Sequence, residues 1–274
     1  MKSELTTKLN KLKSYLSSLE SVVIAFSGGV DSTFLAKIAL EVLGESNVLA
    51  ITATSSTYPA RELQHAEELA KLMGLKYKLI VSEELEIKDF AENSPDRCYF
   101  CKNELFCKLA QEAEKEGMNK VVDGSNLDDT ADYRPGMKAA FERGVVSPLK
   151  EAGLTKDDIR VLSKQLGLPT WNKPAMACLS SRFPYGQQIT KEKLLEVERA
   201  EELLHKRGFS QFRVRHHGHT ARIEVMPEEF AKIVEFAYEL NKEIKNIGFT
   251  YVALDLGGFR SGSMNETIQN KGAV

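Results

Sequence analysis

The chain has 274 residues, of which 42% are apolar and 28% charged, so it is long enough to bury a core in one large domain plus a smaller one. Its formal net charge of -2 gives no overall attraction to nucleic acid, so no nucleic-acid partner is expected. Residues 1–21 contain no continuous apolar stretch. This excludes a signal peptide or a membrane anchor there and makes the cytoplasm the expected location.

Helices and strands alternate over the first 170 residues. A helical period of leucines covers residues 4–20, residues 21–26 have the composition of a buried strand, and a glycine pair then leads into a helix at 31–43. Further strands are expected at 47–54, 76–82 and 120–124, and further helices at 60–73, 101–116 and 155–167. This alternation predicts an α/β fold with a doubly wound parallel sheet, whose ligand crevice lies beyond the carboxyl ends of the strands.

A second, smaller domain is expected after the proline-bearing segment 168–174, which has neither a helical nor a strand period. The predicted domains are therefore 1–170 and 171–274. The second begins with a helix at 190–207 and continues with strands at 211–216 and 220–226 around Gly218, a helix at 227–245 and a strand at 249–254. This order predicts a C-terminal α+β domain with a hairpin, expected to bind the substrate.

The segment Ser27–Ser32 reads Ser-Gly-Gly-Val-Asp-Ser and joins a strand to a helix N-terminus. Free backbone N–H groups and the helix dipole favour an anion there, and the glycines let the backbone approach it. Because the segment lacks the lysine and the spacing of a Walker A loop, cleavage of a γ-phosphate is not expected. The alternative is a tight turn with an aspartate cap.

The hexapeptide resembles the signature of the PP-loop ATP pyrophosphatase superfamily. That resemblance implies that ATP is split between its α and β phosphates, with an acyl or amide oxygen adenylated and pyrophosphate left in the loop. It also implies a set of ATP-binding residues, with Asp31 catalytic as well: Ala25, Phe26, Ser27, Gly28, Gly29, Asp31, Ser32, Thr52, Ala53 and Gly124. The carboxylates of residues 123–129 are candidate Mg²⁺ ligands, with a polar turn as the equal alternative.

Four cysteines are too few for a disulfide framework, which favours metal, cluster or catalytic use. Cys98 and Cys101 are close enough in sequence to bind one metal or cluster, and Cys178 lies at the expected domain boundary. Three thiolates leave one iron of a 4Fe-4S cube without a protein ligand, whereas a fourth ligand of another type would suit zinc. Thiols without a metal are the alternative, and it is favoured for Cys107, at a core-like position on a helix.

The segment Trp171–Gly186, which contains Cys178, resembles the LarE family of ATP-dependent sulfur transferases, which build the nickel-pincer nucleotide cofactor. Further segments fit the same family: Asp132–Gly136, Arg213–Arg215, Ala221–Glu224 and Leu254–Gly262. The resemblance implies that the substrate is pyridinium-3,5-biscarboxylic acid mononucleotide. One carboxylate at a time would be adenylated and converted to a thiocarboxylate, and a homo-oligomer is implied as well.

The best-known members of that family have only the late cysteine and give up its sulfur, leaving dehydroalanine. Because Cys98 and Cys101 are added here, the chain is more similar to a cluster-bearing subgroup. In that subgroup Cys98, Cys101 and Cys178 would be the ligands of a 4Fe-4S cluster, with exchangeable sulfide on its open iron and an external sulfide source. The sacrificial route, with Cys178 as the sulfur donor, is the alternative.

An anionic substrate gives a physical reason for several arginines, because guanidinium binds carboxylate and phosphate bidentately. Arg213 and Arg215 share one strand face and are expected to hold one phosphate together. The expected substrate-binding residues are Ser180, Ser181, Arg182, Arg213, Arg215, Glu224 and Arg260. For any one arginine, a solvated surface charge is an equal alternative. His216, His217 and His219 are expected to be exposed hairpin residues rather than metal ligands.

Three other functions share some of these features. A PP-loop tRNA thiolase pairs such a loop with a three-cysteine cluster, but the net charge and the absence of zinc-binding cysteine pairs at the chain ends disfavour it. An ammonia-using synthetase would leave the three cysteines without a role. A nucleotide-sensing module with structural zinc would bind ATP and release no pyrophosphate.

Overall fold

The structure is a computed structural model that describes residues 2–131, 135–174, 176–260 and 262–263. The chain forms two compact units, the first containing Met1–Glu84 and Asp96–Met176 and the second Leu85–Pro95 and Ala177–Val274. The short segment Leu85–Pro95 belongs to the second unit because its backbone is bonded there: the N–H of Ile189 donates to the carbonyl of Ala91 at 2.8 Å. None of the described helices is long and apolar enough to span a membrane.

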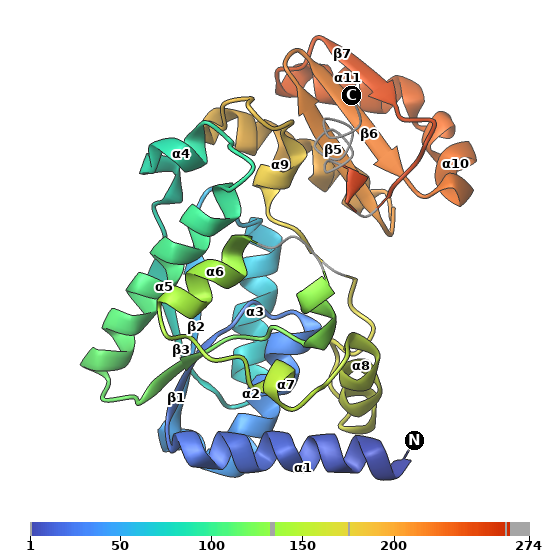
Figure 1. Ribbon diagram of the computed structural model, residues 1–274. Coiled ribbons are helices and arrows are strands. Elements are labelled where there is room, and N and C mark those ends of the chain that lie inside the picture. Colours follow the sequence, from blue (N-terminus) through green and yellow to red (C-terminus); the bar gives the residue numbers. More distant parts are fainter. Residues whose placement is uncertain (1, 132–134, 175, 261, 264–274) are drawn as a thin grey trace, which may run out of the picture. The chain divides into compact units, whose positions relative to one another are not determined.

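The first unit is built on a parallel sheet with strand order β3-β2-β1-β4 (Figure 1). The strands are β1 (Val22–Ala25), β2 (Val48–Thr54), β3 (Lys76–Val81) and β4 (Lys120–Val122). The helices are α1 (Lys2–Leu19), α2 (Val30–Leu43), α3 (Ala60–Leu72), α5 (Arg97–Lys115), α6 (Pro135–Glu142), α7 (Pro148–Glu151) and α8 (Lys156–Gln165). In register, Val22 pairs with Val48 on one side and Lys120 on the other. The predicted α/β fold with a parallel sheet is confirmed.

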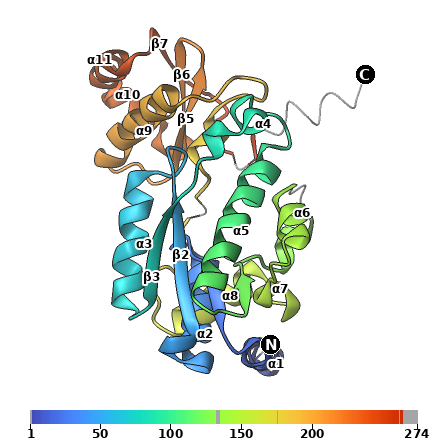
Figure 2. The ribbon, with the colours of Figure 1, turned by 90° about the vertical axis from the view of Figure 1, so that its left-hand side faces the viewer.

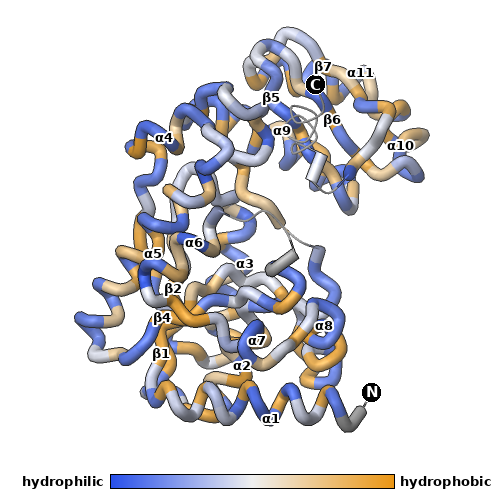
Figure 3. Tube along the Cα trace, in the orientation of Figure 1, coloured by the Kyte–Doolittle hydropathy of each residue, from blue (hydrophilic) through white to orange (hydrophobic). Residues whose placement is uncertain are grey.

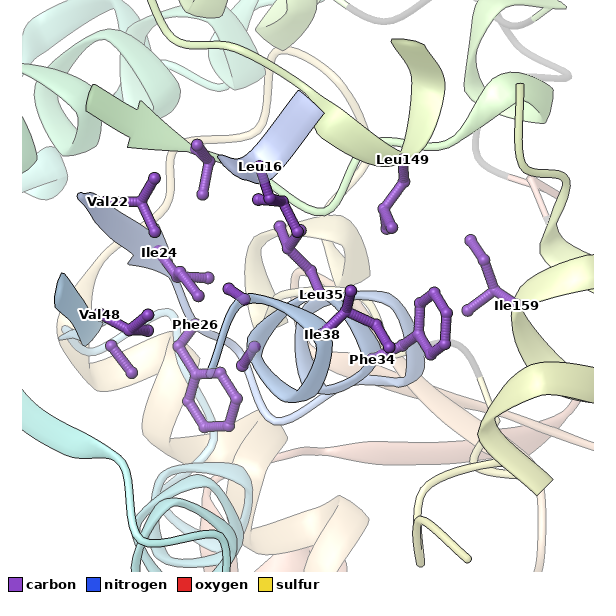
Figure 4. Packing of buried hydrophobic residues seen from close by; sticks show 14 of the residues in the cluster. Leu16, Val22, Ile24, Phe26, Phe34, Leu35, Ile38, Val48, Leu149 and Ile159 are labelled. Carbon is purple, nitrogen blue, oxygen red and sulfur yellow. The ribbon is translucent and has the colours of Figure 1, made fainter. Parts of the chain in front are cut away.

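Helices cover both faces of this sheet, so alternate residues of a strand enter two different cores. Val22 and Ile24 of β1 belong to one core with apolar residues of α1, α2 and α8, as Figure 4 shows, whereas Val23 belongs to a second core with residues of α5. Along α1, apolar and polar residues alternate with a helical period, which is visible in Figure 3. Its Leu12 and Leu16 are fully buried in the first of these cores. Because both faces of the sheet are occupied, a ligand is expected at the carboxyl ends of the strands.

The second unit has a three-stranded sheet of order β5-β6-β7, confirming the predicted C-terminal α+β part. Its strands are β5 (Phe212–His217), β6 (Thr220–Val225) and β7 (Tyr251–Leu254), and its helices are α4 (Lys88–Ala91), α9 (Lys191–Lys206), α10 (Phe230–Glu235) and α11 (Ala237–Ile247). β5 and β6 form the expected antiparallel hairpin around Gly218, and β7 is parallel to β6. α9 packs on β5 and α11 on β7, and the two helices contact each other (Figure 2).

Two predicted helices differ from the observed ones. The single helix predicted at 227–245 is interrupted at Phe236, whose backbone (φ −93°, ψ 4°) is not helical and whose ring lies 5.6 Å under the guanidinium of Arg207. The helix predicted at 101–116 begins four residues earlier, at Arg97. Its earlier start places Cys98 as well as Cys101 on regular helix.

Candidate functional site

The turn between β1 and α2 has the conformation that its glycines predict. Gly28 has φ +62°, and a Cβ at this position would lie 3.0 Å from the Cα of Ala66 on α3, so glycine is required for two reasons. The Oγ of Ser32 accepts from the N–H of Ser27 at 3.2 Å and lies 3.1 Å from its Oγ. These bonds close the loop. The first N–H groups of α2 have no acceptor within the helix and can donate to an anion.

Asp31, in the first turn of α2, is held by residues that are distant in the chain. Its Oδ2 is hydrogen-bonded to the Nζ of Lys156 on α8, and its Oδ1 accepts from the Nδ2 of Asn126 at 3.3 Å. The backbone N–H of Lys156 donates in turn to Asp128 at 2.8 Å. The start of α2, the loop after β4 and the start of α8 therefore form one network. Lys156 was not predicted as a site residue, because its partner is 125 positions away in the chain.

The loop after β4 comes very close to α2, as its glycine predicts. A Cβ on Gly124 would lie 3.1 Å from the backbone N of Ser32. The carboxylate of Asp123 accepts from the hydroxyls of Ser125 and Ser147, both at 2.7 Å, so it is partly engaged by its own surroundings. In the part of the chain that the structure describes, no three His, Cys, Asp or Glu side chains are grouped to hold a metal ion. Magnesium binding by this loop stays a prediction.

The other predicted ATP-binding residues lie at the neighbouring carboxyl ends of β1 and β2. The N–H of Phe26 donates to Ile51 at 2.9 Å, and the Oγ1 of Thr52 donates to the carbonyl of Phe26 at 2.7 Å. Ala25 pairs with Ile51, and Ala53 is half-buried one residue beyond Thr52. The structure thus brings these residues beside the phosphate loop. Their contacts with ATP stay a prediction.

Two side chains that were not predicted donate to carbonyl oxygens of the phosphate loop. The hydroxyl of Tyr58 donates to the carbonyl of Ser27 at 2.9 Å, and the Nζ of Lys173 donates to the carbonyl of Gly28 at 3.2 Å. Lys173 also pairs with Glu62 on α3 at 2.8 Å. Burial and the charge of Glu62 raise the pKa of Tyr58 above its ordinary value, so its hydroxyl keeps the proton that it donates. No local pattern around these residues indicates their partners.

Cys98 and Cys101 lie three residues apart at the start of α5, so their side chains share one face of the helix. Both are thiols rather than disulfides, with Cys98 exposed and Cys101 half-buried. α6 passes close by: a Cβ on Gly136 would lie 2.9 Å from the Cγ of Lys102 and 3.5 Å from the carbonyl oxygen of Cys98. Cys107, also on α5, is half-buried rather than in the core.

Cys178 belongs to the second unit, where it is exposed and precedes the 3-10 turn Leu179–Arg182. Its carbonyl oxygen accepts from the N–H of Ser181 at 3.0 Å, from the Oγ of Ser181 at 2.9 Å and from the Nη1 of Arg182 at 2.9 Å. The backbone is thus fixed while the thiol is accessible. Because Cys98 and Cys101 belong to the first unit, the convergence of the three thiols stays a prediction.

Two of the arginines expected at an anionic substrate are bound to carboxylates of the protein itself. Arg182, whose side chain is 0% exposed, donates through Nε and Nη2 to Glu201, both bonds at 2.8 Å. Arg215 donates in the same way to Glu224 at 3.0 and 2.7 Å. The sequence predicts that these arginines bind oxyanions bidentately, but no sequence pattern identifies Glu201 as the partner of Arg182. Glu224, expected at the substrate, is fully buried and also accepts from Arg222 at 2.9 Å.

Arg213 differs from Arg182 and Arg215. Its guanidinium lies 5.0 Å over the ring of Phe259 and donates to the carbonyl of Phe212 at 2.7 Å, and no carboxylate of the described residues forms an ion pair with it. Burial, together with the charges of Arg182 and Arg215, lowers the pKa of Arg213 to about 10. It is still a cation at neutral pH and retains donors for an anion.

The remaining predicted substrate residues have different environments. The Oγ of Ser180 is buried and has no hydrogen-bond partner among the residues that the structure describes. The Oγ of Ser181 accepts from Arg182 at 2.9 Å. Arg260 is exposed, with its Nη1 3.4 Å from the carbonyl of Gly258. Five residues of the segments that fit the LarE family lie outside the described residues: Asp132, Tyr133, Arg134, Ala175 and Ser261.

The expectation that His216 is exposed is wrong. Its ring is stacked on Phe183 with the centroids 5.1 Å apart, its Nδ1 lies 2.9 Å from the amide of Gln187, and its Nε2 lies 3.2 Å from Glu196 on α9. The reason is the alternation of β5, which points this side chain to the face that α9 covers. Burial lowers the pKa of His216 although Glu196 acts to raise it. His217 and His219 are exposed, as expected.

The chain is similar to known proteins over both units. The NAD synthase family profile matches residues 4–122. The pyridinium-3,5-bisthiocarboxylic acid mononucleotide synthase of Lactiplantibacillus plantarum is 41% identical over 264 residues, which cover 96% of each chain. An uncharacterized protein of Synechocystis sp. is 46% identical over 96% of this chain and 99% of its own, and one of Methanocaldococcus jannaschii is 33% identical over 93% and 98%.

Proposed function

Because this chain belongs to the LarE family, that of the pyridinium-3,5-bisthiocarboxylic acid mononucleotide synthase, we propose that it is an ATP-dependent sulfur transferase. The substrate would be pyridinium-3,5-biscarboxylic acid mononucleotide, whose carboxylates become thiocarboxylates. The observation that carries the proposal is the glycine loop Ser27–Ser32, closed on itself at the N-terminus of α2, in a chain that matches this relative over both units. The full-length match favours this substrate over a tRNA base.

In the proposed first step, a carboxylate oxygen of the substrate attacks the α-phosphorus of ATP. The bond from that phosphorus to the oxygen bridging the β-phosphate breaks, and pyrophosphate leaves. Amides of the loop and of the first turn of α2 stabilise the charge of the leaving group. Lys156, bonded to Asp31 at the same helix end, adds a fixed positive charge, and Mg²⁺ would neutralise phosphate oxygens as it does in PP-loop enzymes.

In the proposed second step, a sulfur nucleophile attacks the activated carbonyl carbon. A carbon–sulfur bond forms, the carbon–oxygen bond to the adenylate breaks, and AMP leaves with the electron pair. We propose that Cys98, Cys101 and Cys178 hold a 4Fe-4S cluster that supplies the sulfide when it is bound. The donor set fits such a cluster: all three residues are thiols, and two of them share one face of α5. An external sulfide source and a homo-oligomeric assembly are part of this proposal.

Arg213 is proposed to bind the anionic end of the substrate. No carboxylate of the described residues forms an ion pair with it, and its partly buried guanidinium would form strong hydrogen bonds with a phosphate. Ser180 supports the same assignment, because a buried hydroxyl that has no partner among the described residues gains most from a bound ligand. Arg182 and Arg215 would support the substrate site indirectly: they bind Glu201 and Glu224, and Arg182 also donates to the backbone carbonyl of Cys178.

The exposed thiol of Cys178 supports a second candidate route for the sulfur. Here its thiolate attacks the activated carbonyl carbon and AMP leaves. Loss of the Cα proton then breaks the bond between Cβ and sulfur, which yields the thiocarboxylate and dehydroalanine at position 178. Each chain would then act once for each sulfur atom. The cluster route and this route differ in what remains at position 178 after turnover.

Iron and acid-labile sulfide analysis of anaerobically purified protein tests the cluster. We expect about four irons and four sulfides per chain with a broad visible absorption, the complement of a cubane cluster. Cys101→Ser should lose them and Cys107→Ser should keep them. A colourless protein that contains only zinc would refute the cluster. Mass spectrometry after turnover should find Cys178 intact, and loss of the mass of its sulfur would establish the sacrificial route.

Pyrophosphate release tests the activation step independently of the sulfur source. Release from ATP should depend on the mononucleotide and should be insensitive to added tRNA. ATP binding without release in the presence of the mononucleotide would contradict adenylation and would favour a nucleotide-sensing module.

A further inference from the structure

The carbonyl oxygens of Ser27 and Gly28 are consecutive acceptors in the phosphate loop, and each has a side-chain donor from elsewhere in the first unit. Tyr58 donates to the first at 2.9 Å and Lys173 to the second at 3.2 Å. We propose that Tyr58 and Lys173 are positioning residues, which fix these two peptides so that the N–H groups of Gly28 and Gly29 face the bound phosphates. The inference rests on the proposed function, since that identifies the anion in the loop as the pyrophosphate part of ATP.

The geometry of the peptide bond connects the carbonyls to the amides. In a planar trans peptide, the C=O of one residue and the N–H of the next point in opposite directions. The donor on the carbonyl of Ser27 therefore turns the N–H of Gly28 away from Tyr58, and the donor on the carbonyl of Gly28 turns the N–H of Gly29 away from Lys173. The two hydrogen bonds to the carbonyls of Ser27 and Gly28 therefore orient the N–H groups of Gly28 and Gly29 toward the opposite side of the loop.

The loop needs this support because its own conformation is permissive. Gly28 has φ +62°, and glycine loses more conformational freedom on ordering than any other residue. Among the described residues the N–H of Gly28 has no acceptor, and that of Gly29 makes only a 3.4 Å contact with the Oγ of Ser27. Without outside donors these peptides would rotate. The cost of ordering them would then be added to the binding of every phosphate.

The turn that carries Tyr58 is held by a buried carboxylate. Tyr58 ends this turn, and its N–H donates to the carbonyl of Ser55 at 3.2 Å. The hydroxyls of Ser55 and Thr57 both donate to the Oε1 of Glu84, which is 1% exposed. A side chain on this turn has little freedom, so Tyr58 reaches the loop from a rigid support. Glu84 is therefore predicted to act on the phosphate loop through Tyr58.

Lys173 is fixed by Glu62 in a similar way. The two side chains form an ion pair at 2.8 Å and are 16% and 10% exposed. Glu62 lies on α3, the helix whose Ala66 packs on Gly28. α3 thus provides both the residue that packs on Gly28, which is Ala66, and the residue that pairs with Lys173, which is Glu62.

The test measures equilibrium binding of magnesium pyrophosphate, ATP and AMP by calorimetry for the wild type, Tyr58→Phe and Lys173→Met. Each variant should bind pyrophosphate and ATP about threefold to tenfold more weakly, as expected for one lost hydrogen bond, and AMP equally well. AMP is the matched ligand because it lacks the β and γ phosphates. Tyr15→Phe, a tyrosine change on α1 that removes neither of these two hydrogen bonds, should alter none of the three affinities.

A purely structural role for these side chains predicts a different result. Weaker binding of all three ligands in proportion would overturn the proposal, as would unchanged binding of pyrophosphate. Since Lys173→Met leaves Glu62 with only the longer 3.5 Å pair to Arg61 among the ion pairs of the described residues, Lys173→Met/Glu62→Gln is the second variant and should show the same selective loss. If Glu84 acts through Tyr58, Glu84→Ala should weaken pyrophosphate binding in the wild type but not further in Tyr58→Phe; additive losses would remove Glu84 from the mechanism.

A spectroscopic measurement separates orientation of the amides from direct contact with phosphate. The ¹⁵N amide resonances of Gly28 and Gly29 should move in the free Tyr58→Phe and Lys173→Met variants, before any ligand is added. Unchanged resonances in Lys173→Met with weaker pyrophosphate binding would assign Lys173 to direct phosphate contact and overturn its positioning role. A wild type that binds neither pyrophosphate nor ATP would refute the proposed function itself, whereas wild-type binding with unaffected variants refutes only this inference.

Discussion

The phosphate loop of the first unit presents backbone amides to its proposed ligand, and the side chains of Tyr58 and Lys173 hold the loop from outside. In the second unit the charged side chains themselves were expected to bind the ligand. There, Arg182 and Arg215 are instead paired with Glu201 and Glu224, whereas Arg213 forms no ion pair with a carboxylate of the described residues. A glycine-rich phosphate loop can be recognised as a site from the sequence, because few other structures require that backbone conformation. An arginine cannot be recognised in this way, because its guanidinium can pair with a buried carboxylate of the protein as well as with a substrate.

The largest effect is expected from breaking a buried pair of the second unit. Arg182→Met would leave the carboxylate of Glu201 buried without its bidentate partner, which should lower the free energy of unfolding by about 3–5 kcal/mol in urea denaturation. Replacing both residues, Arg182→Met/Glu201→Leu, should recover most of that loss, since no unpaired charge remains. If the double variant is as unstable as the single one, the ion pair is not what Arg182 contributes.

In the first unit, Asp31→Asn should reduce pyrophosphate release by at least about 100-fold, as removal of an electrostatic stabiliser from a transition state does. The asparagine side chain would lack the negative charge that holds Lys156 at the start of α2, and it would weaken the hydrogen bond from Asn126. Initial rates at saturating ATP measure the effect. Asp157→Asn is the matched control, because Asp157 is exposed and adjacent to Lys156. Unchanged release would mean that the loop amides act without this network.

The third prediction compares two neighbours on one strand face. Arg213→Gln should weaken binding of the mononucleotide by about 10- to 100-fold, the effect of losing a hydrogen bond to a charged group, while unfolding free energy stays nearly unchanged. Arg215→Gln should instead lower the free energy of unfolding, because Glu224 loses its hydrogen bonds from the Nε and Nη2 of Arg215. Calorimetric titration and urea denaturation of both variants decide the matter. Equal losses of stability would contradict the distinction between them.

The sequence predicted features whose causes are local in the chain. The strand, the glycine turn and the helix from Val22 to Leu43 follow from periodicity and from a turn conformation that glycine adopts at no steric cost. The carboxyl ends of β1, β2 and β4 also follow, since parallel strands bring them together.

Features that depend on distant partners were not predictable. Lys156 meets Asp31 across 125 positions, and Lys173 meets Gly28 across 145. The pairing of Arg182 with Glu201 is nearer in sequence, yet an arginine has many acidic residues within such a distance, so spacing alone cannot select one. Likewise the break between α10 and α11 lies in an uninterrupted apolar period, and packing of Phe236 under Arg207 accompanies it. Tertiary packing decides these features.

The smallest effect concerns His216, a buried titratable group of the second unit on whose pKa burial and the ion pair with Glu196 act in opposite directions. Burial lowers its pKa below the ordinary value of 6.5, while Glu196 acts to raise it and Lys193 to lower it. Above pH 6.5 the imidazole of His216 is neutral in both the folded and the unfolded chain, so its contribution to the free energy of unfolding is fully present there. As the pH falls below 6.5, the unfolded chain binds a proton that the folded chain does not, and stability is lost. Urea denaturation at several pH values should therefore show that the wild type loses stability relative to His216→Gln on acidification. A relative gain would mean that the ion pair with Glu196 outweighs burial, as the carboxylates do for Arg182 and Arg215.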